Sequence, residues 1–168
     1  MTFRELTTPR PEDFAMRPDH EPSDTQFHFE HRVPVRFRDI DVGGHAHHSQ
    51  ALVYMEEART QYWGQVASVD DPARIDYILA EALVRYHERI LYPDLLRVQV
   101  RTTAVGRTSF ELEYRVLAGD GRLLASGRTT MVLYDYTEGR SRRIPDELRA
   151  RFEAFEGRNL PRRRERDA

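Results

Sequence analysis

Cysteine and lysine are both absent from this chain of 168 residues. Without cysteine, the chain cannot form disulfides, a zinc–thiolate site or a cysteine nucleophile. Without lysine, it cannot form a Schiff base with a substrate or carry the lysine of a phosphate-binding loop. All 26 basic residues are therefore arginine. These two absences exclude several classes of catalytic and metal-binding site.

Long apolar runs and a net positive charge are also absent. No run approaches the roughly 18 apolar residues that a membrane-spanning helix requires. The first residues lack the basic start and apolar core of a signal peptide. We therefore expect a cytoplasmic protein with no membrane partner. The formal net charge is −2 at pH 7, so we also expect no nucleic-acid partner.

The length suits one domain with a substantial core. Residues 1–26 contain four prolines among many acidic residues and show no periodicity, so we interpret them as a mobile N-terminal arm. The regular patterns run over residues 27–156. Residues 157–168 form a charged tail. The prediction is one folded domain with an extension at each end.

Hydrophobic periodicity predicts the secondary structure of this domain. Apolar residues alternate from Phe27 to Phe37, which predicts a strand, and residues 49–67 have the spacing of a helix. Residues 76–91 fit either structure on propensity, and the alternation of Val84 and Tyr86 favours a strand. The remaining predicted elements are strands near 96–102, 110–116 and 123–136, and a helix that Pro145 opens.

The order of these elements predicts the fold class. Short turns between consecutive strands imply antiparallel pairing, and Asp120-Gly121 is a strong hairpin signal. The first helix is apolar enough to lie across one face of the sheet. We therefore predict an α+β domain in which an antiparallel five-stranded sheet wraps around a central helix, followed by a short C-terminal helix.

A polar cluster lies between the end of the first strand and the start of this helix. Two carboxylates, two glycines and three histidines fall between Asp39 and His48. A helix N-terminus offers free backbone N–H groups and about half a unit of positive charge, which can stabilise a developing oxyanion. A neighbouring carboxylate can act as a nucleophile or a general base. The loop is therefore the candidate catalytic site.

The motifs together resemble the hot-dog fold acyl-CoA thioesterases, in particular the 4-hydroxybenzoyl-CoA thioesterase-like branch. Residues 38–45, RDIDVGGH, look like that family's Asp-x-Asp followed by small residues and glycine. Residues 56–60, EEART, look like its Glu-x-Ala-Arg in the central helix. Residues 105–110 and 127–129 resemble its strand motifs. The resemblance covers about 27–156 and implies a hot-dog fold and hydrolysis of acyl-CoA thioesters.

The resemblance also implies roles for individual residues. Asp41 matches the acidic residue that acts as nucleophile or general base, and His48 matches the position at the helix start whose backbone N–H polarises the thioester carbonyl. Gly44 belongs to the tight catalytic loop. The resemblance further implies a homodimer or homotetramer with each active site at a subunit interface. It implies no metal and no cofactor beyond the coenzyme A of the substrate.

Four residues are predicted to contact the substrate. His45 lies in the catalytic loop, and Tyr54 lies on the aromatic stripe of the central helix that could line an acyl pocket. Coenzyme A carries phosphates, which arginines bind well, and Arg107 and Arg128 are the candidates for this role.

Several alternatives stay open at this stage. The sequence does not separate direct attack by Asp41 from activation of water, and coenzyme A is not separated from acyl carrier protein. Asp39 would point to the other face of a continuing strand, and we interpret it as structural. The three histidines could bind a metal, although their spacing is weak support. A non-catalytic acyl-binding or assembly domain is the alternative function, and a dehydratase is a third.

Overall fold

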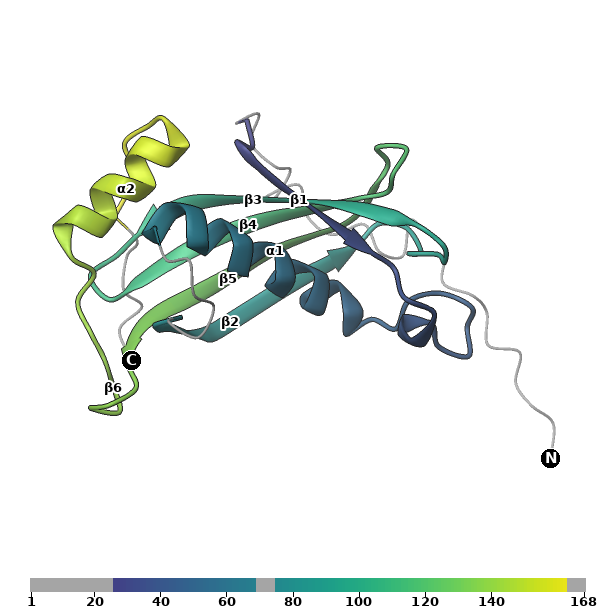
Figure 1. The fold of residues 1–168 in the computed structure, drawn as a ribbon, viewed down its shortest axis with the longest axis horizontal. Helices are drawn as coiled ribbons and strands as arrows, with labels where there is room; N and C mark the ends of the chain where they lie inside the picture. Colours follow the sequence, from purple (N-terminus) through teal and green to yellow (C-terminus); the bar gives the residue numbers. More distant parts are fainter. Residues whose placement is uncertain (1–25, 69–74, 163–168) are drawn as a thin grey trace.

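The computed structural model describes residues 26–68 and 75–162 (Figure 1). The predicted N-terminal arm, except Gln26, and the end of the predicted tail lie outside these residues. In chain order the elements are β1 (Phe29–Pro34), the 3₁₀ turn η3 (Phe37–Asp39), α1 (Gln50–Ala67), β2 (Tyr77–Tyr86), β3 (Leu95–Val105), β4 (Ser109–Leu117), β5 (Leu123–Asp135), β6 (Arg140–Ser141) and α2 (Asp146–Glu156).

One antiparallel sheet with α1 across one face forms the body of the molecule, as predicted (Figure 1). The strand order is β1-β3-β4-β5-β2, and the short β6 pairs with the end of β5. The loop that precedes α1 lies at one end of the sheet, whereas α2 and β6 lie at the other end (Figure 1). The outer strands of the main path are therefore β1 and β2.

The central helix buries a stripe of residues against the sheet. Its buried positions recur every three or four residues, as an amphipathic helix requires: Ala51, Tyr54, Met55, Ala58, Arg59, Tyr62, Trp63 and Val66. The Trp63 ring stacks on Phe110 of β4 with the ring centroids 5.4 Å apart. Gly127 of β5 permits the close approach, because a Cβ there would lie only 2.8 Å from the Met55 Sδ.

The two faces of the sheet differ in composition. Phe110, Met131 and Leu133 are buried in the core beneath α1. Side chains alternate along a strand, so Ser109 and Thr130 point to the opposite face. We call this opposite face the outer face of the sheet.

The first strand is shorter than the alternating pattern predicted. It ends at Pro34, and residues 37–39 form a 3₁₀ turn instead of continuing the strand. The Arg36 backbone N–H donates to Oδ2 of Asp39 at 2.8 Å, and this contact closes the turn. Phe37 is consequently 78% exposed. The prediction that the strand continues to Phe37 is wrong, because the 3₁₀ turn begins at this residue.

The later elements follow the prediction closely. Residues 77–86 form a strand, β2, which resolves the ambiguity of the 76–91 segment. Phe152 of α2 is fully buried, with Leu148 and Phe155 packed partly against the core. Leu160 is 5% exposed, and the Pro161 carbonyl accepts the Val105 N–H. The chain therefore stays packed on the domain beyond Glu156, where we expected the tail to begin.

Candidate active site

The predicted catalytic loop is a closed turn between η3 and α1. An isolated β-bridge joins Ile40 and Ala46. Inside it, the Asp41 N–H donates to the His45 carbonyl at 3.0 Å, and the Gly44 N–H donates to the Asp41 carbonyl at 3.0 Å. Gly44 has a φ of +73°, a conformation that glycine adopts at little cost. The turn therefore depends on the conformational freedom of Gly44.

The Asp41 carboxylate is held by one backbone donor. The Gly43 N–H donates to Asp41 Oδ1 at 2.7 Å, and His45 Nδ1 lies 3.9 Å from the same oxygen. Among residues 26–68 and 75–162, Asp41 Oδ2 has no recorded hydrogen-bond partner. The side chain is 29% exposed. One carboxylate oxygen is therefore anchored and the other is available to a substrate or a water molecule.

His48 lies two residues before Gln50, the first residue of α1, with Ser49 between them as the N-cap. The His47 carbonyl accepts the Gln50 N–H at 2.8 Å. Because a trans peptide is planar, the His48 N–H points opposite to that carbonyl. No acceptor for the His48 N–H is recorded in the described part of the chain. The first turn of α1 contains no acidic residue that would neutralise the positive end of the helix dipole. This N–H is therefore a free donor in a positive field.

Beneath the loop, Asp39 and Tyr54 form a buried pair. Asp39 is 3% exposed, and its Oδ2 accepts both the Arg36 N–H and the Tyr54 hydroxyl, the latter at 2.9 Å. The Asp39 carbonyl accepts the His47 N–H at 2.8 Å. Asp39 thus has the structural position expected for it. Tyr54 is fully buried on this carboxylate, so in this chain its hydroxyl faces the loop from the core side.

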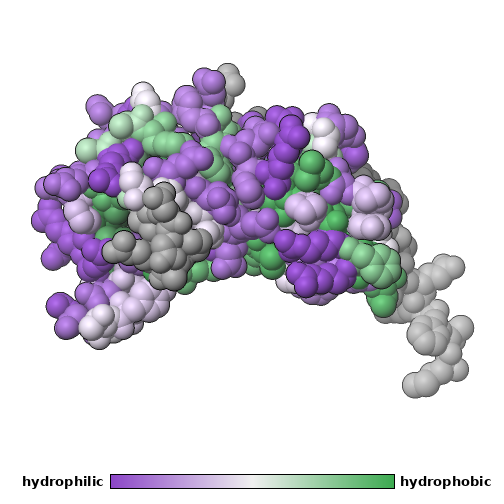
Figure 2. All heavy atoms as spheres, viewed as in Figure 1, coloured by the Kyte–Doolittle hydropathy of each residue, from purple (hydrophilic) through white to green (hydrophobic). Residues whose placement is uncertain are grey.

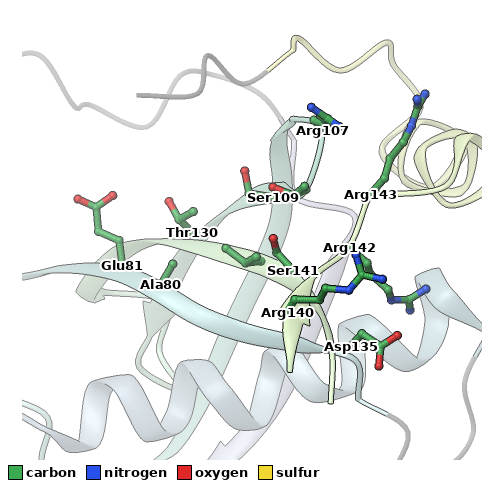
Figure 3. Close-up of a pocket in the computed structure, with 12 residues that line it drawn as sticks. Ala80, Glu81, Arg107, Ser109, Thr130, Asp135, Arg140, Ser141, Arg142 and Arg143 are labelled. Atoms are coloured by element: carbon green, nitrogen blue, oxygen red, sulfur yellow. The ribbon is translucent and has the colours of Figure 1, made fainter. Parts of the chain in front are cut away.

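Arg107, one of the predicted phosphate ligands, lines a hollow of about 790 Å³ on the outer face (Figure 3). Three more arginines line it: Arg140, Arg142 and Arg143. Arg142 forms an ion pair with Asp76, and Arg143 lies 3.5 Å from Asp146. The Arg107 side chain has no recorded ion pair within the described residues. Glu81 and Asp135 also line this hollow, which we call the arginine pocket, so arginine is in excess over carboxylate and Arg107 is available to bind an anion.

Arg128, the other predicted phosphate ligand, lies elsewhere. It points to the outer face from the middle of β5, where it pairs in register with Glu113 of β4 and Leu83 of β2. With these residues and Arg85 it lines a small hollow of about 50 Å³. The structure therefore does not bring Arg107 and Arg128 into one pocket.

The sequence-predicted residues fall into three places. Asp41, Gly44, His45 and His48 share the loop before α1, Tyr54 lies under this loop, and the two arginines lie on the outer face.

No group of three or more His, Asp or Glu side chains in residues 26–68 and 75–162 is arranged to hold a metal ion. No helix in this part of the chain is long and apolar enough to cross a membrane. The surface in Figure 2 is mixed, with polar residues over most of the face that it shows and apolar ones between them.

Known proteins are similar to this chain in sequence and in fold. The sequence model of the thioesterase-like superfamily matches residues 35–152. The chain belongs to this superfamily. It is 26% identical to the acyl-CoA thioester hydrolase YbgC of Escherichia coli O157:H7 over 128 residues, which are 72% of this chain and 94% of YbgC. It is 28% identical to YsmA of Bacillus subtilis, an uncharacterised protein, over 73% of this chain and 84% of YsmA.

A solved structure agrees with the superfamily assignment. It is that of a thioesterase from Thermus thermophilus complexed with coenzyme A and Zn, with a TM-score of 0.73 and 36% identity. The alignment covers 80% of this chain and 98% of the Thermus protein. Within the superfamily, this chain has the hot-dog fold, with the sheet wrapped on α1.

Sequence reasoning did not identify two groups that shape the site. The first is the Gly43 N–H, which anchors the Asp41 carboxylate. The two adjacent glycines in the sequence indicated a tight loop but not this hydrogen bond. Tyr86 of β2 donates its hydroxyl to the His48 carbonyl at 2.5 Å across 38 residues of chain. Its alternation with Val84 indicated a strand and nothing about this contact.

Proposed function

We propose that this chain hydrolyses acyl-CoA thioesters through Asp41, with N–H groups at the start of α1 as the oxyanion hole. The observation that carries the proposal is the loop that joins them. One oxygen of Asp41 is anchored by Gly43 and the other is open, and the free N–H of His48 follows in the same loop. Membership of the thioesterase-like superfamily supports the same reaction, and the chain is accordingly a thioester hydrolase.

The chemistry needs a nucleophile and a place for negative charge. Asp41 either attacks the thioester carbonyl itself, giving an anhydride that water then cleaves, or removes a proton from the attacking water. In both routes the C–S bond breaks and the sulfur leaves as the thiolate of coenzyme A, which then takes up a proton. The carbonyl oxygen gains negative charge in the transition state, and one donor in such a hole is typically worth about 10²–10³-fold in rate.

The arginine pocket is the proposed site for the phosphates of coenzyme A. Arginine binds phosphate oxygens through a planar fork of N–H donors, and Arg107 is the arginine of the pocket with no recorded ion pair among the described residues. Arg128 offers a second cation on the same outer face. The proposal uses no metal and no further cofactor, because Asp41 and backbone donors supply the groups that the reaction needs.

The positions of the loop and the pocket support a homodimer. The loop lies at one end of the sheet, and β6, which contributes Arg140 and Ser141 to the pocket, lies at the other end (Figure 1). β2 is a ten-residue outer strand with Leu79, Leu83 and Tyr86 each about half exposed, and such an edge favours pairing with another strand. Two copies of β2 paired about a two-fold axis run antiparallel. This brings the loop of one copy toward the arginine pocket of the other, so each active site lies at the interface.

A thiol-release assay tests the proposal. The protein and its Asp41→Asn variant are assayed on acyl-CoA thioesters from short to long chains and on aromatic ones. Asparagine keeps the oxygen that accepts the Gly43 N–H, so the loop stays closed. Asp120→Asn, in the exposed hairpin between β4 and β5, is the matched control.

We expect hydrolysis by the parent protein and the control, and a loss of at least about 100-fold in kcat for Asp41→Asn. The substrate panel then names the preferred acyl group, and acyl carrier protein thioesters tested in parallel decide the carrier. No hydrolysis above background, or equal hydrolysis by all three proteins, contradicts the mechanism. It would favour a hot-dog domain that binds acyl groups or assembles with partners without catalysis.

A further inference from the structure

Two contacts fasten the catalytic loop to the segment around the end of β2. The Ala46 N–H donates to the Ile90 carbonyl at 2.8 Å, and the Tyr86 hydroxyl donates to the His48 carbonyl at 2.5 Å. The first contact joins two backbones and does not depend on side chains. The second depends entirely on one phenol, at the last residue of the outer strand β2.

The His48 carbonyl has no other recorded donor in the described residues. In a regular helix it would accept the N–H four residues later, at Leu52. Here the Leu52 N–H donates to Ser49 instead, at 3.2 Å. The Tyr86 hydroxyl therefore donates to a carbonyl that takes no part in the hydrogen bonds of the helix. Because the His48 carbonyl has no other recorded donor in the described residues, its hydrogen bond with Tyr86 gives the Tyr86 hydroxyl a defined position.

This contact fixes the backbone of His48 from the C-terminal side. A peptide group is planar, so holding the His48 carbonyl sets the orientation of the whole peptide between His48 and Ser49. The preceding peptide is set by the contact between the His47 carbonyl and the Gln50 N–H. With both neighbouring peptides restrained, the His48 N–H has little freedom to turn. Without Tyr86, the peptide between His48 and Ser49 keeps one recorded contact among the described residues, in which the Ser49 N–H donates to His47 Nδ1 at 3.3 Å.

The hydroxyl of Tyr86 is suited to this role. Burial raises the pKa of Tyr86 above its usual value, so the phenol stays protonated and keeps donating throughout the neutral range. Tyr86 is 49% exposed in a single chain.

We infer that Tyr86 is a positioning residue for hydrolysis, because its hydroxyl holds the peptide that follows His48 and so helps to keep the His48 N–H, in the peptide before it, directed at the developing oxyanion. The inference rests on the proposed function. Tyr86 touches neither the substrate nor Asp41, and acts through the backbone of His48. It also makes the end of β2 a part of the catalytic apparatus, although this strand lies 38 residues from His48.

The test replaces Tyr86 by phenylalanine, which removes only the hydroxyl. Tyr92→Phe is the matched control, because Tyr92 is 51% exposed near the same end of the sheet and its hydroxyl has no recorded hydrogen bond among the described residues. Three properties are measured for each variant: kcat and KM separately, the melting temperature, and the NMR signals of the His48 and Ser49 amides with their hydrogen exchange.

For Tyr86→Phe we expect kcat to fall by about 10–100-fold, the range that a misplaced catalytic group typically costs. KM should stay within about 3-fold, since substrate binding does not use the hydroxyl. The His48 and Ser49 amide signals should shift and their exchange should quicken, whereas the melting temperature stays near that of the parent. Tyr92→Phe should match the parent in every measurement.

The outcomes separate this inference from the proposed function. An active parent with an equally active Tyr86→Phe variant overturns the inference and leaves the proposed function intact. A fall in kcat that accompanies general unfolding, with amide changes spread over the domain, also overturns it. If the parent itself shows no hydrolysis, the proposed function fails. The role of Tyr86 in hydrolysis then fails with it, whereas an active parent with an unaffected variant overturns the inference alone.

Discussion

The Tyr54 hydroxyl lies 2.9 Å from Oδ2 of Asp39 and donates to it, which ties the first turns of α1 to the loop that carries Asp41. Burial, together with the Asp39 carboxylate, raises the pKa of Tyr54 far above its usual value, so the phenol stays a donor. Only one other donor to Asp39 Oδ2 is recorded in the described chain, the Arg36 N–H. A nearly inaccessible carboxylate thus depends on two hydrogen bonds.

Replacing Tyr54 by phenylalanine should therefore destabilise the protein. A buried acceptor that loses its partner typically costs about 1–3 kcal/mol, and each kcal/mol lowers the melting temperature by about 2–4 °C in a domain of this size. Tyr136→Phe is the control, because Tyr136 is 63% exposed and its hydroxyl bonds a strand carbonyl at 3.1 Å. Thermal unfolding of both variants measures the difference. Equal melting temperatures would show that Asp39 does not need the phenol.

Replacing Arg107 by glutamine should weaken substrate binding with little effect on the chemical step. The loss of one charged contact to a phosphate is expected to raise KM for acyl-CoA about 10-fold, with kcat nearly unchanged. Hydrolysis of the same acyl group on pantetheine, which has no phosphate, should not change. Arg32→Gln, on the exposed side of β1, is the control. If KM rises equally for both substrates, Arg107 does not bind phosphate.

Mixing two impaired variants should restore activity if each site is shared by two copies. Asp41→Asn lacks the catalytic carboxylate, and Arg107→Gln lacks the phosphate ligand. In a mixed dimer, one site combines the intact Asp41 of one copy with the intact Arg107 of the other. Random exchange makes half of the dimers mixed, so about a quarter of the sites are intact. The assay is run at low substrate concentration after unfolding and refolding the variants together. Activity equal to the average of the separate variants would place both residues of each site in one chain.

Local sequence patterns predicted most of the fold, because the hydrophobic residues of each helix or strand recur with the period of that element. Alternation gave the strands, the three-to-four spacing gave α1, and Asp120-Gly121 gave a turn at which Gly121 has a φ of +94°. The same patterns gave a wrong strand end at Phe37, because the alternation continues into residues 37–39, which form a 3₁₀ turn. A period of two describes which residues share a face, but it does not say where the strand ends.

The candidate site was only partly predictable for a different reason. Asp41, Gly44 and His48 are close in sequence, so their motif placed them in one loop. The contacts of Tyr86 with His48 and of Tyr54 with Asp39 join residues 38 and 15 positions apart. Tyr54 was predicted from its helix stripe to face the substrate, and a stripe cannot distinguish a pocket from the core. The arginine pocket gathers β4, β5 and β6, which only the tertiary fold brings together.

A lysine at Leu83 should weaken association of two copies. Leu83 lies in the middle of the outer strand β2, is 48% exposed, and lines one hollow with Arg85 and Arg128. A further positive charge there opposes strand pairing, and we expect the dissociation constant of the dimer to rise at least about 10-fold. Leu95→Lys, at a residue 45% exposed near the other sheet edge, is the control. Sedimentation across a concentration range measures both, and unchanged association of Leu83→Lys would place the interface elsewhere.

The last prediction concerns the dependence of stability on pH at His87. Burial, with a smaller contribution from Arg85, lowers the pKa of His87 below its usual 6.5, and its Nε2 lies 2.8 Å from the Ser126 hydroxyl. The folded protein therefore favours the neutral ring, whereas the unfolded chain takes up a proton near its ordinary pKa. The stability that His87 provides is present above that value and is lost as the pH falls through the folded pKa.

Between about pH 7.5 and pH 5.5, the parent should therefore lose more thermal stability than His87→Gln, which cannot titrate. The variant keeps a polar group for Ser126, so the comparison isolates the proton. His28→Gln, at an exposed residue before β1, should follow the parent. Melting temperatures of the three proteins across this range give the slopes. If the slopes of the parent and His87→Gln are equal, His87 binds protons equally in the folded and unfolded states and does not contribute to the pH dependence of stability.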